Sequence, residues 1–320
     1  MSERDIKRLL AVVEATLGRE WLDVAEWLRE QNQIDEIERA LRTNDFRELV
    51  AAVEAAARRF AAAMDAGFIR AGQAAADWLD SQPSLSNKIV RFDMKNERAI
   101  AAARRNEIEL VRGLTEEARE TIRIALVDGQ TSGKNPRSIA RDIHDTITLT
   151  PSQAQHVLNY RRALEMGDWS NALGRELRDA RSDRTIHRLI RDGGSLTEEQ
   201  IDRMVARYRD NYVTFRAETI ARTESSRNVH TGLQEAFTQA VERGDIEADQ
   251  LVREWIAGPR TPNAREQHQE MNGQQRKLNE PFVAPDGTPL MYPGDGPPKH
   301  SANCRCTVAA TLQPARSQTA

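Results

Sequence analysis

The stretch that decides the fold is Leu196-Thr197-Glu198-Glu199-Gln200-Ile201. A threonine followed three residues later by glutamine forms a capping box, and the flanking Leu196 and Ile201 have the spacing of a hydrophobic staple. From this start to Glu242 the chain contains no proline, and Gly232 is the only glycine. The pattern predicts one very long helix, or two helices joined at a bend, because the stretch exceeds the usual globular length.

The chain before this stretch also carries helix signals. Asn135-Pro136 offers an N-cap followed by proline at the first helical position, and Thr150-Pro151-Ser152-Gln153 is a second capping box whose helix ends at Gly167. Apolar residues three or four apart form two stripes: Ile6, Leu10, Val13, Leu17, Trp21, Val24 and Leu28, then Phe46, Val50, Val53, Ala57, Phe60, Met64 and Phe68. We interpret these stripes as the core of a helix bundle, with a partner-binding helix as the alternative.

Near Gly244 the character of the sequence changes. Prolines gather in residues 259–298, helical periodicity stops, and the short apolar runs are Trp255–Ala257, Phe282–Val283, Leu290–Tyr292 and Thr307–Val308. Pro285-Asp286-Gly287-Thr288 lies between two of these runs and fits a hairpin turn. These features predict a small α+β module with the strands of the protein confined to it.

The predicted fold class is therefore mainly α, an elongated helical N-terminal body with a small α+β C-terminal module. A chain of 320 residues is long enough for two domains. We divide it into an N-terminal helical region (1–82), a helical body (83–244), the α+β module (245–311) and a disordered tail (312–320). The first boundary follows Gln82-Pro83-Ser84, which breaks the helical pattern.

Composition narrows the functional classes. Apolar residues make up 39% of the chain, charged residues 30% and aromatic residues 5%, a mixture that suits amphipathic helices. The net charge of −3 provides no global basic field that would attract nucleic acid or membrane. We find no apolar run near the roughly 20 residues that span a bilayer and no secretory signal at the N-terminus. Two cysteines do not make a disulfide scaffold, so we expect synthesis in a reducing cytoplasm.

The ending Pro297–Cys306 holds both cysteines, Cys304 and Cys306, and His300. His268 could reach them if a hairpin from Phe282 to Tyr292 folds back. Two cysteines and two histidines would complete a tetrahedral, closed structural zinc site. Two alternatives without metal stay open. The thiols could be buried as small apolar groups beside hydrogen-bonded histidines, or they could form a strained disulfide with each other.

Enzymatic hypotheses use the same side chains. Cys304 with His300 or His268 could act as nucleophile and base. A nuclease would use His268 and His300 as acid and base, with Arg260 or Arg265 holding phosphate. No flanking signature of a catalytic family accompanies either arrangement, so we expect that the protein is not an enzyme.

A basic run extends from Arg175 to Arg191. Its spacings of three and four place several arginines on adjacent parts of one helical face, with Asp179, Asp183 and Asp192 interleaved. A solvated helix is one interpretation. The other is sequence-independent contact with double-stranded DNA or an acidic partner surface. The candidate binding residues are Arg178, Arg181, Arg184 and Arg188.

Several phrases of the sequence, in this order, resemble the phage Mu F-like / SPP1 minor head protein family over roughly residues 120–310. They are Asn135–Ala140, Asn159–Arg161, Arg216–Glu224, Trp255–Ala257, Arg260–Gly273, Pro289–Asp295 and Pro297–Cys306. Within Arg260–Gly273, cysteine often stands in the family where this chain has His268. Pro259 departs from the pattern, since many relatives carry Asp before Arg-Thr.

The resemblance implies a minor capsid protein of phage head morphogenesis, bound to the portal and found inside the procapsid. It implies the portal protein and other capsid or scaffolding proteins as partners, nonspecific double-stranded DNA as a further one, and no membrane. The expected location is the virion, in the capsid interior or at the portal vertex, after synthesis in the host cytoplasm. The expected role is structural; the alternative is a nuclease or other enzyme using His268, His300 and Cys304.

Overall fold

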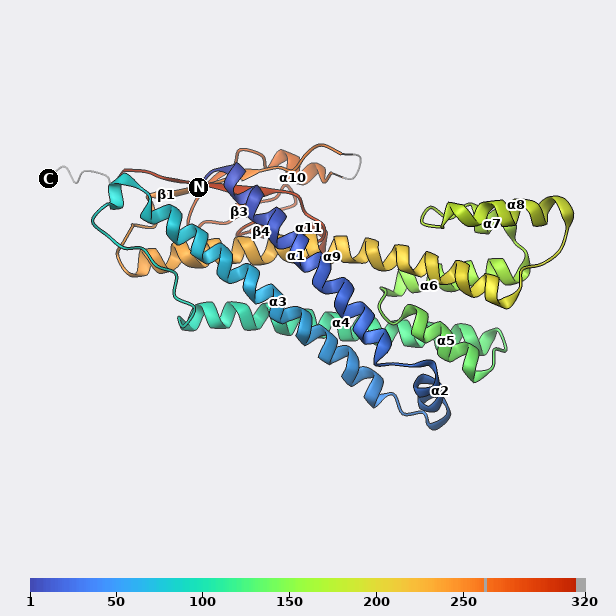
Figure 1. The fold of residues 1–320 in the computed structure, drawn as a ribbon. Helices are drawn as coiled ribbons and strands as arrows, with labels where there is room; N and C mark the ends of the chain where they lie inside the picture. The colour runs from blue at the N-terminus through green and yellow to red at the C-terminus, as the bar shows by residue number, and fades with distance from the viewer. Residues whose placement is uncertain (262–263, 315–320) are drawn as a thin grey trace. The chain divides into compact units, whose positions relative to one another are not determined.

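The computed structural model describes residues 1–261 and 264–314 (Figure 1). The fold is mainly α with a small sheet-containing C-terminal region, as predicted. The α-helices are α1 (Glu3–Glu30), α2 (Ile34–Thr43), α3 (Arg47–Asp80), α4 (Glu97–Thr131), α5 (Pro136–Thr146), α6 (Pro151–Met166), α7 (Trp169–Leu173), α8 (Asp183–Asp192), α9 (Glu198–Glu242), α10 (Glu266–Glu270) and α11 (Pro298–Ser301). The strands are β1 (Leu251–Ile256), β2 (Gln275–Lys277), β3 (Phe282–Val283), β4 (Pro289–Leu290) and β5 (Thr307–Leu312).

The predicted helix starts are confirmed. The Asn135 side chain accepts from the Ser138 N–H at the start of α5, and Thr150 and Gln153 form both bonds of the capping box of α6. Gly167 ends α6 with a φ of 70°. Thr197 and Gln200 cap α9 reciprocally, and α9 then runs for 45 residues as one helix. Local hydrogen bonds therefore fix these starts without tertiary help.

The chain forms two compact units, each assembled from separated stretches. The first unit contains residues 1–21, 60–108 and 218–320, and the second contains residues 22–59 and 109–217. Helices α1, α3, α4 and α9 contribute residues to both. No helix in the described part of the chain has the length and apolarity that crossing a bilayer requires.

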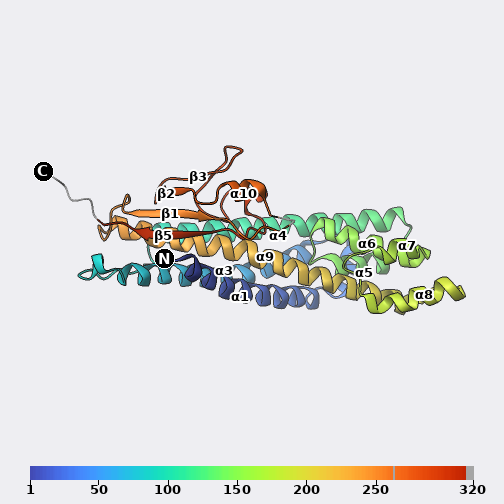
Figure 2. The same cartoon turned by 90° about the horizontal axis from the view of Figure 1, so that it is seen from above.

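The first unit contains every described strand. A three-stranded antiparallel sheet has the order β2-β1-β5, with Trp255 opposite Val308, and β1 and β5 run alongside the C-terminal part of α9 (Figure 2). The predicted hairpin is confirmed as β3 and β4, which pair Phe282 with Leu290. Of the predicted tail, residues 315–320 lie outside the described residues. Leu312 ends β5, and the Gln313 N–H donates to the carbonyl of Gln250.

One face of β1 builds the core of the C-terminal module. Leu251, Arg253 and Trp255 are buried and alternate with half-buried residues. The cluster around Trp255 also contains both cysteines and the following side chains: Met271, Phe282, Ala284, Leu290 and Val308. Alternation along a strand places residues i and i+2 on the same face, which is why Arg253 enters this interior.

Arg253 joins the module to α9. Its guanidinium donates to the Gln234 side chain at 3.1 Å and to the carbonyls of Met291, Lys277 and Glu280 at 2.6, 2.8 and 2.5 Å. A buried guanidinium needs such partners because an unpaired buried charge is costly. The module and the C-terminal part of α9 are therefore tied together by one buried side chain.

In the second unit the basic run does not form one helical face, and that prediction is wrong. Leu173 ends α7, Ala180–Ser182 forms a 3₁₀ turn, and α8 begins only at Asp183. The cause is local, because the Asp179 side chain caps the 3₁₀ turn by accepting from the Arg181 N–H. Of the four candidate arginines, two lie on α8 and two precede it.

Candidate functional site

The structure brings together three of the four predicted metal ligands. His268 lies on α10, while Cys304 and Cys306 lie between α11 and β5. The His268 Nδ1 atom is 3.5 Å from each sulfur, and the ligand atoms of the three residues lie within 4.8 Å of one another. Exposure is 2% for His268, 3% for Cys304 and 4% for Cys306. The three side chains form one buried N/S cluster.

His300, the fourth predicted ligand, lies on the far side of the His268 ring. Its Nδ1 atom is 3.1 Å from His268 Nε2, and the two rings stack with centroids 5.4 Å apart. On its other side, His300 Nε2 is 3.1 Å from an Asp286 carboxylate oxygen. Asp286 belongs to the turn between β3 and β4, so the predicted hairpin does fold back onto the site, with a residue that the zinc hypothesis did not use.

This chain of contacts allows the tautomers of both rings to be assigned. Lys299 donates to Asp286, and with the Thr288 and His300 hydrogen bonds this holds the pKa of Asp286 well below its usual range. An ionised Asp286 accepts from His300 Nε2–H, so neutral His300 keeps its lone pair on Nδ1. That lone pair accepts from His268 Nε2–H. The lone pair of His268 is therefore on Nδ1, the atom that faces the two sulfurs.

Several backbone contacts hold the cysteine segment in place. Arg265, just before α10, donates to the carbonyls of Lys299 and Ala302 at both ends of the turn that carries His300. Asn303 adopts a left-handed φ of 54°, and its N–H donates to the Thr223 hydroxyl of α9 at 2.8 Å. The ligand loop is thus fixed to α9 on one side and to α10 on the other.

Gly258 permits the closest backbone approach at the site. A Cβ added there would lie 2.8 Å from Arg305 Cβ and 2.9 Å from its carbonyl carbon. The Gly258 N–H also donates a hydrogen bond to the Cys306 sulfur, which lowers the pKa of that thiol. Only glycine leaves room for the strand end after β1 to pass this close to the residue between the cysteines.

The two thiols differ in acidity. The hydrogen bond from Cys304 lowers the pKa of the Cys306 thiol. The same hydrogen bond to Cys306, together with burial, raises the pKa of Cys304. The pair therefore favours a thiolate on Cys306 that accepts from a Cys304 thiol. Such a thiolate is both a nucleophile and a metal ligand.

A pocket of about 210 Å³ adjoins the sulfurs. Its lining includes Cys304, Cys306, Pro259, Arg222 and Glu14, and all of its residues belong to the first unit. The Arg222 guanidinium pairs with Glu14 at 3.2 Å. Among the cluster members, the two cysteines line the pocket and His268 does not.

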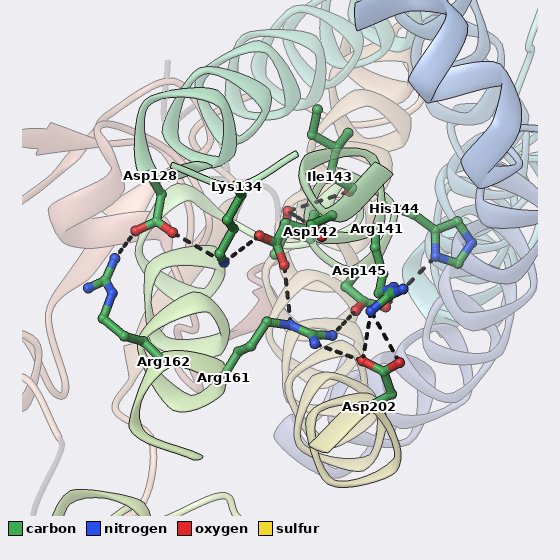
Figure 3. Close-up of polar contacts among 12 residues, drawn as sticks. Asp128, Lys134, Arg141, Asp142, Ile143, His144, Asp145, Arg161, Arg162 and Asp202 are labelled. Atoms are coloured by element: carbon green, nitrogen blue, oxygen red, sulfur yellow. Dashed lines mark hydrogen bonds and ion pairs between the residues drawn. The ribbon is translucent and has the colours of Figure 1, made fainter. Parts of the chain in front are cut away.

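A second cluster, in the second unit, was not predicted from the sequence. The Arg161 side chain of α6, 5% exposed, contacts three carboxylates: Asp142 at 3.2 Å, Asp145 at 3.3 Å and Asp202 at 2.7 Å (Figure 3). Arg209 reaches Asp145 from α9 at 2.5 Å. These four contacts tie α5 and α6 to the first half of α9.

The same network extends to the end of α4. Lys134 lies 2.8 Å from Asp142 and 3.7 Å from Asp128, which also pairs with Arg162 (Figure 3). Burial raises the pKa of Asp142 despite the nearby cations. At Asp145 burial acts in the same direction, but the His144 hydrogen bond and the charges of Arg209 and Arg161 bring the pKa below its usual range. These cations are occupied by carboxylates, which favours a structural role.

The candidate DNA-binding arginines divide into two kinds. Arg178 pairs with Asp183 at 2.9 Å and Arg181 pairs with Asp179 at 2.9 Å. Arg184 and Arg188 are exposed on α8, and neither forms an ion pair within residues 1–261 and 264–314. Two of the four candidates therefore offer a cation that forms no ion pair in this part of the chain.

Comparison with protein families gives one match. Residues 159–309 match the family described as Phage Mu protein F like protein. The match begins in α6, ends in β5 and includes α9 and the N/S cluster. The resemblance seen in the sequence is confirmed over this range, which is a Mu F-like region and associates the chain with phage head morphogenesis and the virion. Searches of curated proteins and of solved structures found no match.

Proposed function

We propose that this protein is a minor head component that binds the portal protein, or a capsid or scaffolding protein beside it, inside the assembling head. The observation that carries the proposal is the Mu F-like match over residues 159–309. In this proposal the protein works by binding and without turnover, before or during DNA packaging.

The way the C-terminal module is attached supports a binding role. Besides Arg253, several side chains of α9 link it to the module. Among them, Ser226 donates to the Pro293 carbonyl at 3.2 Å, Thr231 contacts the Tyr292 hydroxyl at 3.0 Å, and Gln234 donates to the Leu278 carbonyl at 3.0 Å. These contacts hold the loops of the module against a helix. A rigid surface loses little entropy when a partner binds it.

The burial of the histidines argues against the nuclease alternative. His268 is 2% exposed and His300 is 1% exposed, so a scissile phosphate would have no access to either ring. A general acid or base must come within hydrogen-bond reach of the proton it transfers. Arg265, one of the proposed phosphate holders, already donates to two backbone carbonyls.

Co-expression with the structural proteins of the same phage tests the proposal. The full chain should co-purify with the portal protein or with procapsids, and a tail protein expressed at the same level serves as the control. Procapsids that form normally and contain none of this chain would overturn the proposal. Incubation of the pure protein with plasmid DNA and divalent metal ions tests the alternative, since cleavage lost in His268→Ala would establish a nuclease.

A further inference from the structure

We infer that Cys304, Cys306 and His268 form a zinc site with three protein ligands, whose fourth position opens to the pocket beside the two sulfurs. This site differs from the closed four-ligand shell expected from the sequence, because His300 contacts His268 and not the metal position. The inference does not rest on the proposed role in the phage head.

The spacing of the three ligand atoms fits a metal. With Zn–S near 2.3 Å and Zn–N near 2.0–2.1 Å, a tetrahedral shell separates a sulfur from a nitrogen by about 3.5 Å. Both sulfurs lie at this distance, 3.5 Å, from His268 Nδ1. Two thiol or thiolate sulfurs with one imidazole nitrogen form a donor set that zinc prefers over magnesium or calcium.

Hydrogen bonds alone account less well for this arrangement. The Nδ1 atom of a neutral imidazole has one lone pair in the ring plane, so it accepts one good hydrogen bond. Here two sulfurs stand at the same distance from that atom. A metal ion between the three atoms would use the lone pair and both sulfurs at once.

His300 and Asp286 act as positioning residues for the ligand. Metal-bound histidines commonly donate their other N–H to a carboxylate or another acceptor, which fixes the tautomer and the ring orientation. His268 Nε2 does so toward His300, which in turn donates to Asp286, with 3.1 Å at each step. The arrangement keeps the metal-facing nitrogen of His268 unprotonated, as a ligand must be.

The residues around the cluster indicate where the fourth coordination position of the metal lies. Within the described ranges no other histidine, cysteine or carboxylate joins the three ligand atoms. Both cysteines line the pocket of about 210 Å³, so the remaining corner of the tetrahedron lies on that side. Water, or a small anion from solution, would complete the shell there.

The metal itself provides the first test. Protein purified without chelator, or stripped and then given zinc sulfate, should hold about one zinc per chain, and X-ray absorption of this sample should show two sulfur and two nitrogen or oxygen neighbours. Cobalt(II) in place of zinc should give sulfur-to-metal charge-transfer bands, and added azide should shift the visible bands if the fourth position is open. A zinc-free protein with two reactive thiols, or a disulfide, would overturn the inference. A shell of two sulfurs and two imidazoles that ignores azide would overturn the open position.

Variants of the full chain then separate ligands from positioning residues. Cys304→Ser, Cys306→Ser and His268→Ala should each abolish stoichiometric binding. His300→Ala should bind roughly 10–100-fold more weakly yet keep the sulfur-to-cobalt bands, and His300→Gln, which can still accept from His268, should recover part of the affinity. His187→Ala, on the exposed face of α8, is the matched control. Complete loss of metal in His300→Ala, with the fold intact, would restore His300 as a ligand. If the serine variants fail to fold, X-ray absorption of the wild-type sample decides whether two sulfurs bind the metal.

Discussion

Gly232 of α9 faces the carbonyl oxygen of Phe68 in α3. A Cβ added at Gly232 would lie 2.4 Å from that oxygen and 2.9 Å from the Cβ atom of Ala71. The only glycine of α9 therefore marks a point of close backbone approach between the two helices in the first unit. Glycine usually weakens a helix interior, and here close packing compensates for that weakness.

Gly232→Ala should destabilise the first unit by about 1–3 kcal/mol, the usual cost of overpacking, because the obstacle is backbone and cannot rotate away. Gly113→Ala is the matched control: it is also inside a helix, α4, but a Cβ there meets nothing within 4 Å. Helix propensity should make that variant more stable by about 0.5–1 kcal/mol. Urea unfolding of both variants gives the comparison, and an equal response would contradict the close-packing explanation.

Arg253→Met should loosen the C-terminal module. Burial lowers the pKa of Arg253 to about 10, so the side chain stays charged at neutral pH and donates to three carbonyls. Methionine would fill the space but leave these acceptors unpaired, at a cost on the order of 3 kcal/mol. Hydrogen exchange should rise in β1 and β5. Arg260→Met, at an exposed position, should leave exchange unchanged.

His230 should make the stability of the first unit depend on pH. Burial lowers the pKa of His230 to about 4, although its contacts with the Ser226 and Pro293 backbone oppose the shift. Between about pH 6.5 and pH 4 the unfolded chain binds a proton that the folded chain excludes, so stability falls as the pH falls. The full effect is on the order of 3 kcal/mol. His230→Gln should flatten this part of the curve, whereas His187→Gln should not.

The helices could be predicted because their signals are local, whereas part of the sheet and the site could not. Thr150, Thr197 and Gly167 act on backbone groups within one turn, so sequence spacing specifies the contact. Gln275–Lys277 forms β2 without any apolar alternation, since backbone pairing with β1 places it at the sheet edge. No spacing rule would have indicated that strand.

Sequence spacing specifies only local contacts, and this also explains why the role of His300 could not be predicted. Its place four residues before Cys304 suggests a ligand, and only the folded turn shows that it points to His268 and Asp286. The Arg161 cluster was missed for a similar reason. Its carboxylates come from α5 and α9, and neither helix identifies the other as a neighbour in the sequence.

DNA binding by the basic run should be weak and should depend on α8 alone. Of the four candidate arginines, only Arg184 and Arg188 form no ion pair within the described residues, so these candidates would neutralise at most about two phosphates. The logarithm of the binding constant should then fall with the logarithm of salt concentration with a slope no steeper than about −2. Arg184→Ala/Arg188→Ala should remove this retention. Retention that survives would place the DNA contact elsewhere.

Arg161→Met should destabilise the second unit more at neutral than at acidic pH. Three aspartates share this nearly buried cation, and removing it leaves buried carboxylates with too few partners, at a cost of about 3–5 kcal/mol. Pairing with the cations holds the pKa of Asp145 below its value in the unfolded chain. The stability that this pairing contributes is therefore present at a pH above the unfolded-state pKa, and it is lost as the pH falls through the folded-state pKa.

Urea unfolding at about pH 7 and about pH 3, which is below the ordinary aspartate pKa of about 3.9, measures this difference, because protonated aspartates no longer need the arginine. Arg181→Met, whose side chain is 80% exposed, should cost less than about 1 kcal/mol at either pH. Adding Asp142→Asn and Asp145→Asn to Arg161→Met should recover part of the lost stability, since the unpaired charges are removed. The same loss at both pH values, without recovery in the triple variant, would mean that Arg161 contributes by packing of its aliphatic stem and not by its charge.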